Sequence, residues 1–186
     1  AIVVGVIDSG VRYTHEDIAA SMWVNPDEIP ANGLDDDNNG YVDDIHGINA
    51  ITGSGDPVDD NGHGSHCSGT IAGVGNNGKG GAGVAWNARI MALKFLSFHG
   101  GAASDAVKCI EYARVMGARL TSNSWGSGGV SEAEQSAISD SVNAGQLFVT
   151  SAGNDGSNND YTPTYPSNYP LPGIVSVAAT DRTDVL

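Results

Sequence analysis

Two histidines lie three residues apart in a run of small residues, Asp60–Thr70 (DNGHGSHCSGT). Such a pair could bind a metal ion, transfer protons in catalysis, or only begin a helix. We do not favour a zinc site, because two histidines at this spacing lack a third nitrogen or carboxylate ligand nearby. A histidine at the start of a glycine- and serine-rich helix is well placed for catalysis, since an acid can orient one ring nitrogen while the other faces a nucleophile.

Asp8 is the candidate for that acid. It ends the continuous apolar run Ile2–Asp8 (IVVGVID), which is typical of a strand buried on both faces of a parallel sheet. Taken alone, an aspartate followed by Ser-Gly is as compatible with a helix cap or a turn. The histidine segment shifts the balance toward a catalytic pair.

The elements that must position these groups alternate along the chain. Four later apolar runs resemble the first one and predict further strands: Ala88–Leu96, Ala118–Gly126, Gly145–Asn154 and Gly173–Asp181. This pattern predicts an α/β fold with a mostly parallel sheet flanked by helices and joined by right-handed crossovers. Active groups in such sheets lie at the carboxyl ends of strands, where Asp8, the SNSWG segment and Asn154 all fall.

Two helices have recognisable ends. Ser104 precedes a segment that places Val107, Ile110 and Ala113 on one face. Ser131 with Glu134 forms a capping box, and Gly145 ends that second helix.

Composition narrows the functional classes. The chain of 186 residues fits one domain, and no apolar run is long enough to span a bilayer. With 22 acidic and 8 basic residues the formal charge is −14, which disfavours nucleic acid and anionic membranes as partners and favours cations. Cys67 and Cys109 are interpreted as two buried free thiols in preference to a disulfide.

Four motifs in this order, VIDSGV, HGSHCSGT, NSWG and SAGNDG, resemble the aspartate, histidine, substrate-binding and oxyanion motifs of the subtilisin-like serine proteases, or subtilases. The resemblance runs from Ile2 to about Arg182 and implies a subtilisin-like fold. It implies that Asp8 orients the general base His63 and that Asn154 stabilises the oxyanion. His66 matches a buried helical histidine without a catalytic role.

The same resemblance implies how a substrate binds. Ser124, Trp125 and Gly126 look like one edge along which the family holds an extended peptide, and Gly100 with Gly101 resemble the facing edge. Core packing is the alternative role for Trp125. The expected partners are an extended protein or peptide substrate and a pro-region or protein inhibitor.

The nucleophile is the departure from the family pattern. The G-T-S-x-A motif that carries the family's serine is absent, so residues 1–186 correspond to the N-terminal two-thirds of a subtilase catalytic domain, truncated at its C-terminal end. Either the serine lies beyond Leu186, or the protein is a serine-less relative that binds peptides without cleaving them. We favour the first interpretation, because a lineage without catalysis has no chemical reason to keep Asp8, His63 and Asn154 together.

The acidic segment Leu34–Asp44 (LDDDNNGYVDD) resembles the first half of an EF-hand loop and predicts a Ca²⁺ site. In that register the ligands are Asp35, Asp37, Asn39 and the Tyr41 carbonyl, with Gly40 at the sharp turn. Position twelve holds His46, so closure must come from Asp43 or Asp44, with Glu28 from the preceding loop. A solvated acidic loop is the alternative.

A second calcium site is implied by the resemblance alone. Asp17 and the loop VGNNGKG match the family's calcium loop, which suggests Val74, Asn76 and Lys79 as further members of the site. Calcium at the required concentration is available outside cells, which together with the acidic composition favours a secreted enzyme.

Overall fold

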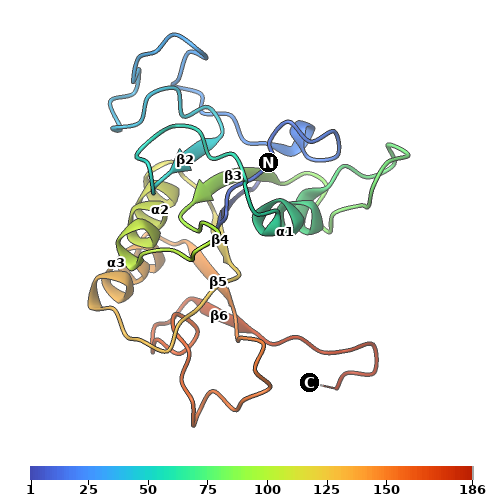
Figure 1. Cartoon of the computed structure of the whole chain (residues 1–186), viewed down its shortest axis with the longest axis vertical. Coiled ribbons are helices and arrows are strands. Elements are labelled where there is room, and N and C mark those ends of the chain that lie inside the picture. Colours follow the sequence, from blue (N-terminus) through green and yellow to red (C-terminus); the bar gives the residue numbers. More distant parts are fainter. Residues whose placement is uncertain (186) are drawn as a thin grey trace.

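The computed structural model describes residues 1–185, and its centre is one six-stranded sheet (Figure 1). The strands are β1 (Val3–Asp8), β2 (Gly47–Asn49), β3 (Arg89–Lys94), β4 (Leu120–Asn123), β5 (Leu147–Ser151) and β6 (Ile174–Val177). Their order is β2-β3-β1-β4-β5-β6, and every neighbouring pair is parallel. The predicted α/β class with a parallel sheet is confirmed.

Three helices cover the two faces of the sheet. Helices α2 (Ala103–Val115) and α3 (Glu132–Asn143) pack against each other on one face, and α1 (His63–Ala72) lies on the opposite face (Figure 1). Successive residues of β3 alternate between the two resulting cores: Met91 and Leu93 face α2, whereas Ile90 and Ala92 face α1. Such a strand is apolar on both sides, which is why its sequence shows a continuous apolar run. A short 3₁₀ helix, η1, spans Ala19–Ser21.

The helix ends follow the sequence signals in part. Ser131 is the N-cap of α3, and its side chain accepts a hydrogen bond from the Glu134 N–H. The other half of the capping box does not form, because the Ser131 N–H donates to the Tyr169 hydroxyl. Gly145 follows α3 at φ +89°, a conformation that glycine adopts without strain.

The sequence prediction was wrong at three structural points. Helix α2 begins at Ala103 after an Ala102 N-cap that has no side-chain cap, so Ser104 lies inside the first turn. Strand β6 is an edge strand with Val175 and Val177 about half exposed, so it is not buried on both faces. Strand β2 has only three residues and was not predicted, because so short a run carries no periodic signal.

The two cysteines were expected to be buried free thiols. Both thiols are free; Cys109 is buried, as expected, but Cys67 is only half-buried.

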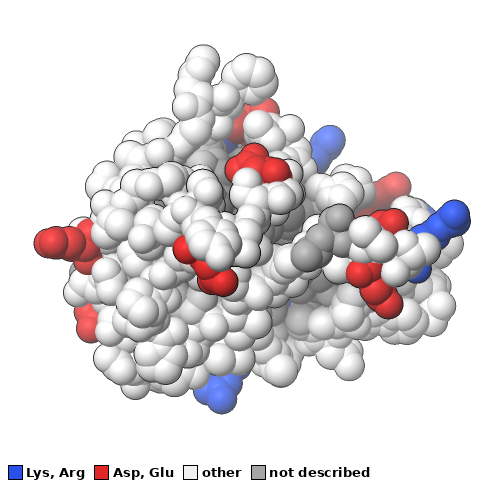
Figure 2. All heavy atoms as spheres, turned by 90° about the horizontal axis from the view of Figure 1, so that it is seen from below, with Lys and Arg blue, Asp and Glu red and all other residues white. Residues whose placement is uncertain are grey.

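No helix among the described residues combines the length and the apolar character that a bilayer crossing needs. The face shown in Figure 2 carries several separate groups of Asp and Glu and only scattered Lys and Arg.

Candidate active site

The structure brings Asp8 and His63 into direct contact at the carboxyl edge of the sheet. Asp8 ends β1 and His63 begins α1. The His63 Nδ1 atom lies 2.7 Å from Asp8 Oδ1 and 2.9 Å from Asp8 Oδ2. An ionised carboxylate only accepts, so Nδ1 carries the hydrogen and Nε2 is left as the acceptor. The Asp8 side chain is 1% exposed and that of His63 is 51% exposed, so the base can be reached from solvent while the acid cannot.

Close packing of backbone makes this contact possible. A Cβ atom added at Gly64 would lie 2.2 Å from the Gly10 carbonyl oxygen and 3.1 Å from Asp8 Cβ. Only glycine at this position lets α1 approach the end of β1. The HGSH pattern therefore places a glycine where the base-bearing helix touches the acid-bearing strand.

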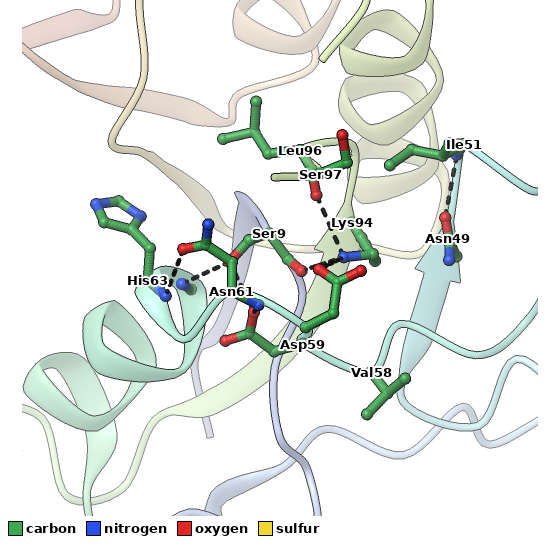
Figure 3. A network of polar contacts seen from close by, with 12 residues as sticks. Ser9, Asn49, Ile51, Val58, Asp59, Asn61, His63, Lys94, Leu96 and Ser97 are labelled. Carbon is green, nitrogen blue, oxygen red and sulfur yellow. Dashed lines mark hydrogen bonds and ion pairs between the residues drawn. The ribbon is translucent and has the colours of Figure 1, made fainter. Parts of the chain in front are cut away.

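Asp59 organises the turn that leads into α1, in the network shown in Figure 3. Its Oδ1 accepts the Ser9 hydroxyl and the N–H groups of Asn61 and Gly62, and its Oδ2 accepts the N–H and hydroxyl of Ser65. Burial raises the pKa of the Asp59 carboxyl, but the hydrogen bonds from Ser65 and from the backbone outweigh burial and hold the pKa below its usual range. Asp59 is therefore an anionic acceptor at the N-terminal end of the helix that carries His63, where a negative charge is favourable.

Ser9 and Cys67, which were not predicted from the sequence, also lie next to the catalytic pair. Ser9 donates its N–H to Asp8 Oδ1 and accepts the Gly64 N–H on its hydroxyl. Cys67 Sγ lies 4.0 Å from His63 Nδ1 and donates to the Ser124 hydroxyl at 3.7 Å. Burial raises the pKa of the Cys67 thiol, so the thiol is protonated at neutral pH. The signal for Ser9 was its position directly after Asp8, and Asp59 could be noticed only as an acid shortly before His63.

His66 differs from the expectation that the resemblance gave. It lies on the exposed side of α1, one turn after His63, and is not buried. Among the described residues its hydrogen bonds involve only its backbone, whose N–H donates to the Gly62 carbonyl and whose carbonyl accepts the Thr70 hydroxyl.

The two segments predicted to bind substrate follow the carboxyl ends of β4 and β3. Ser124, Trp125 and Gly126 directly follow β4. Trp125 packs edge-on against Phe95 and Phe148, with ring centroids 4.9 and 6.4 Å apart. Trp125 is thus half-buried against the core, and its Nε1 is buried without a hydrogen-bond partner among the described residues.

Gly100 and Gly101 lie in the exposed turn between β3 and α2. Ser97 and Gly100 exchange two backbone hydrogen bonds, and Gly100 has φ +94°. A Cβ atom at Gly101 would lie 2.6 Å from the Phe95 carbonyl oxygen, so the turn depends on glycine at both positions.

Asn154 lies in an exposed loop, three residues after β5 ends at Ser151. The described residues form no hydrogen bond with its side chain. The structure therefore places it after the predicted strand but does not bring it into the Asp8–His63 pair.

The acidic loop brings three predicted metal ligands together. Oxygen atoms of Glu28, Asp35 and Asp37 lie within 4.8 Å of one another. Glu28 Oε1 accepts the N–H groups of Asp36 and Asp37, whereas Glu28 Oε2 is buried and has no partner among the described residues. Asn39 donates its side-chain amide to Asp37 and Asp44, and its N–H is shared by Asp35 and Asp37.

The remaining predicted residues of this loop have other contacts. Asp43 accepts the N–H groups of Asn32 and Gly33. Asp44 is fully buried and accepts hydrogen bonds from Asn25, Asn39 and the Tyr112 hydroxyl. Burial raises the pKa of Asp44, although these hydrogen bonds oppose the shift. The Tyr41 ring packs edge-on against Tyr112. The acid that joins Asp35 and Asp37 is therefore Glu28.

The second predicted calcium loop wraps around Asp17. The Val74 N–H donates to the Asp17 carbonyl, and Asp17 Oδ1 accepts the side-chain amide of Asn77 at 2.6 Å. The side chain on Asp17 is thus that of Asn77, the neighbour of the predicted Asn76, which adopts φ +61°. Lys79 forms an ion pair with Glu16, so its side chain does not face Asp17.

The chain is similar in sequence to several known proteins. The chain is 40% identical to subtilisin-like protease 1 of Plasmodium vivax over 151 residues, which cover 80% of this chain and 24% of that protein. It is 32% identical to thermitase of Thermoactinomyces vulgaris, with 97% of this chain and 56% of thermitase covered.

Among solved structures, fervidolysin from Fervidobacterium pennivorans, a keratinolytic enzyme related to subtilisin, superposes with a TM-score of 0.71 at 26% identity, over 94% of this chain and 24% of fervidolysin. The chain thus has the subtilisin-like α/β fold and spans about a quarter of the length of the Plasmodium relatives. The family model described as "Subtilase family" matches residues 1–185. The chain belongs to the subtilase family.

Proposed function

We propose that this chain is part of a secreted serine endopeptidase in which Asp8 and His63 are two members of a catalytic triad. The observation that carries the proposal is the contact of His63 Nδ1 with both oxygens of the buried Asp8, while the other side of the ring faces solvent. Family membership supports a serine-protease type of function. The third member is a serine outside residues 1–186.

The chemistry follows from the protonation that this contact sets. Asp8 holds the hydrogen on Nδ1, so Nε2 can accept the proton of the attacking serine as it adds to the peptide carbonyl. The buried carboxylate then stabilises the imidazolium, which returns the proton to the leaving amine. Asn154, in its exposed loop, is proposed to donate its side-chain amide to the oxyanion once a substrate is bound.

The proposed substrate is a protein or peptide segment in extended form. The turn at Gly100 and Gly101 and the segment Ser124–Gly126 would each offer backbone groups to such a segment, which would lie between them as an added strand. A pro-region or a protein inhibitor could occupy the same position. Extracellular location is supported by relatives such as the "Extracellular protease" of Xanthomonas campestris.

The test replaces each of the two helical histidines in the longer protein that carries the serine. His63→Ala is expected to lower peptide hydrolysis by about three orders of magnitude or more. His66→Ala is the matched control, because this exposed side chain lies on the same helix, and it is expected to keep hydrolysis near the unchanged level. Hydrolysis within tenfold of the unchanged protein after His63→Ala contradicts the proposal. Tight peptide binding without hydrolysis by the unchanged protein supports a serine-less binding relative instead.

We also propose that the acidic loop binds Ca²⁺ between Glu28, Asp35 and Asp37. The support is chemical: three carboxylates converge, and the buried Glu28 Oε2 has no partner among the described residues. A hard cation with oxygen ligands fits this set. Asp17 and its loop are proposed as a second Ca²⁺ site, in which Asn77 replaces Asn76 as the side chain that contacts Asp17. Calcium calorimetry on the chain with and without Asp17→Asn tests the second site, since loss of one binding event is expected.

A further inference from the structure

Lys94 is a buried cation at the carboxyl end of β3. It is 4% exposed, and its Cα pairs with that of Asp8 in the register between β1 and β3. The N–H groups of Phe95 and Leu96 both donate to the Asp8 carbonyl, so the backbone holds this pair of strand ends together. A buried ammonium group is costly unless all of its partners are well placed, which makes its contacts informative.

Its three hydrogen bonds reach three different segments of the site (Figure 3). Lys94 Nζ donates to the Ser9 carbonyl at 2.6 Å, to Asp60 Oδ1 at 2.7 Å and to the Leu96 carbonyl at 3.2 Å. Ser9 follows the acid, Asp60 lies in the turn before the base, and Leu96 begins the segment that leads to Gly100 and Gly101. One ammonium group thus joins the acid-bearing, base-bearing and predicted substrate-bearing segments.

Ser9 passes this restraint on to the catalytic pair. Its N–H donates to Asp8 Oδ1 at 2.7 Å, its hydroxyl accepts from the Gly64 N–H, and the same hydroxyl donates to Asp59. Lys94 fixes the Ser9 carbonyl, and the N–H on the other side of the same Cα donates to the Asp8 carboxylate, so Lys94 restrains the residue that orients Asp8. On the other side, Asp60 follows Asp59, which accepts the N–H groups of Gly62 and Ser65 on either side of His63.

We propose that Lys94 is a positioning residue that holds Asp8 and His63 in hydrogen-bonding geometry through Ser9 and Asp60. This role rests on the proposed function, since it concerns the same pair. An apolar side chain could fill the space but would leave the Ser9 and Leu96 carbonyls without a donor and Asp60 without its ion pair. A misplacement of about 1 Å in such a pair can lower a rate by about 10²-fold.

The first test observes the pair without any catalysis. In the unchanged chain, the Nδ1 proton of His63, bonded to Asp8, is expected to give a low-field proton NMR signal that exchanges slowly with water. Lys94→Met is expected to broaden or abolish that signal while the circular dichroism spectrum is retained. Lys108→Met is the matched control, because Lys108 also bonds a carbonyl and an aspartate, Ala50 and Asp105, but does not touch the pair. Asp60→Asn removes the ion pair from the exposed side without emptying buried space, and a smaller broadening is expected.

The second test measures hydrolysis in the longer protein that carries the serine. Lys94→Met is expected to lower kcat by about 10²-fold with KM changed by less than about threefold, because the substrate contacts remain. If Lys94→Met does not fold, Asp60→Asn tests the positioning role in its place. It is expected to lower kcat by less than Lys94→Met would, with KM unchanged. If Lys94→Met or Asp60→Asn leaves both the NMR signal and kcat at the Lys108→Met level, the positioning role is wrong, even where His63→Ala abolishes hydrolysis. If His63→Ala retains hydrolysis, the proposed function fails, while the NMR signal still tests Lys94.

Discussion

Two clusters of carboxylates among the described residues differ in the groups that contact their oxygens. Around the catalytic pair, Asp8 contacts His63, Asp60 forms an ion pair with Lys94, and Asp59 accepts N–H groups at the start of α1. In the acidic loop the carboxylates accept hydrogen bonds only from backbone N–H groups, amides and the Tyr112 hydroxyl. No ion pair among the described residues reaches Glu28, Asp35 or Asp37.

This difference indicates which of the two acidic clusters needs a cation from outside the chain. Like charges at such distances repel one another unless an opposite charge lies between them. At the catalytic pair, the fold supplies a histidine N–H and one buried cation, Lys94, and so fixes the geometry of a proton transfer. At the loop, the described residues supply uncharged donors but no cation, which is the arrangement expected for an external cation.

The largest effect is expected when the charge of the Asp8 carboxylate is removed. Asp8→Asn in the longer, serine-bearing protein is expected to lower kcat by about 10⁴-fold, the size of the same change in another serine protease. The amide would offer a donor to Nδ1 and favour the wrong tautomer of His63. Steady-state peptide hydrolysis measures the effect, and a loss smaller than tenfold would remove Asp8 from the catalytic pair.

The second-largest expected effect is the change in melting temperature when calcium binds the acidic loop. Calcium at about 100 times its dissociation constant stabilises the bound fold by about 2.7 kcal/mol, which for a chain of this size corresponds to about 5–10 °C in Tm. Glu28→Gln or Asp37→Ala is expected to remove most of that shift. Asp36→Asn is the control, since Asp36 accepts hydrogen bonds from Ile29 and Asn32. Equal melting temperatures in millimolar calcium and in excess chelator would make the loop a solvated acidic surface.

The smallest effect is a pH dependence on the catalytic side. The pKa of Asp59 is lowered in the folded chain by hydrogen bonds that outweigh burial. Its contribution to stability is therefore complete above the ordinary aspartate value of about 3.9 and is lost as the pH falls through the lowered value. We expect Asp59→Asn to be less stable than the unchanged chain at neutral pH, with a gap in urea midpoint that narrows as the solution is acidified. A gap that is constant from pH 7 to pH 3 contradicts this sign.

The sequence predicted the elements whose signals are local. Each long apolar run became a strand of the parallel sheet, and Ser131 and Gly145 marked the ends of α3. Asp8 and His63 could be predicted to meet because a strand end and a helix start lie at the same edge of an α/β sheet. The strands and helix ends needed only periodicity and caps, whereas the choice of Asp8 and His63 as the pair came from the resemblance to the subtilase motifs.

Contacts between distant segments could not be predicted. Lys94 lies within the predicted strand Ala88–Leu96, but the sequence does not show the three oxygens from separate loops on which its burial depends. The choice of Glu28 over Asp43 or Asp44 in the acidic loop depends on how residues 28–44 fold back on themselves. The exposure of His66 and of β6 likewise follows from which surfaces the described residues cover.

Anomalous diffraction from crystals grown with calcium tests the difference between the two clusters most directly. Two groups of metal-capable side chains occur among the described residues: Glu28 with Asp35 and Asp37, and Asp8 with His63 and Cys67. We predict an anomalous peak between Glu28, Asp35 and Asp37 and none at Asp8. A peak at Asp8, or its absence at Glu28 in crystals that contain millimolar calcium, would contradict the claim that, of these two groups, only the loop needs an external cation.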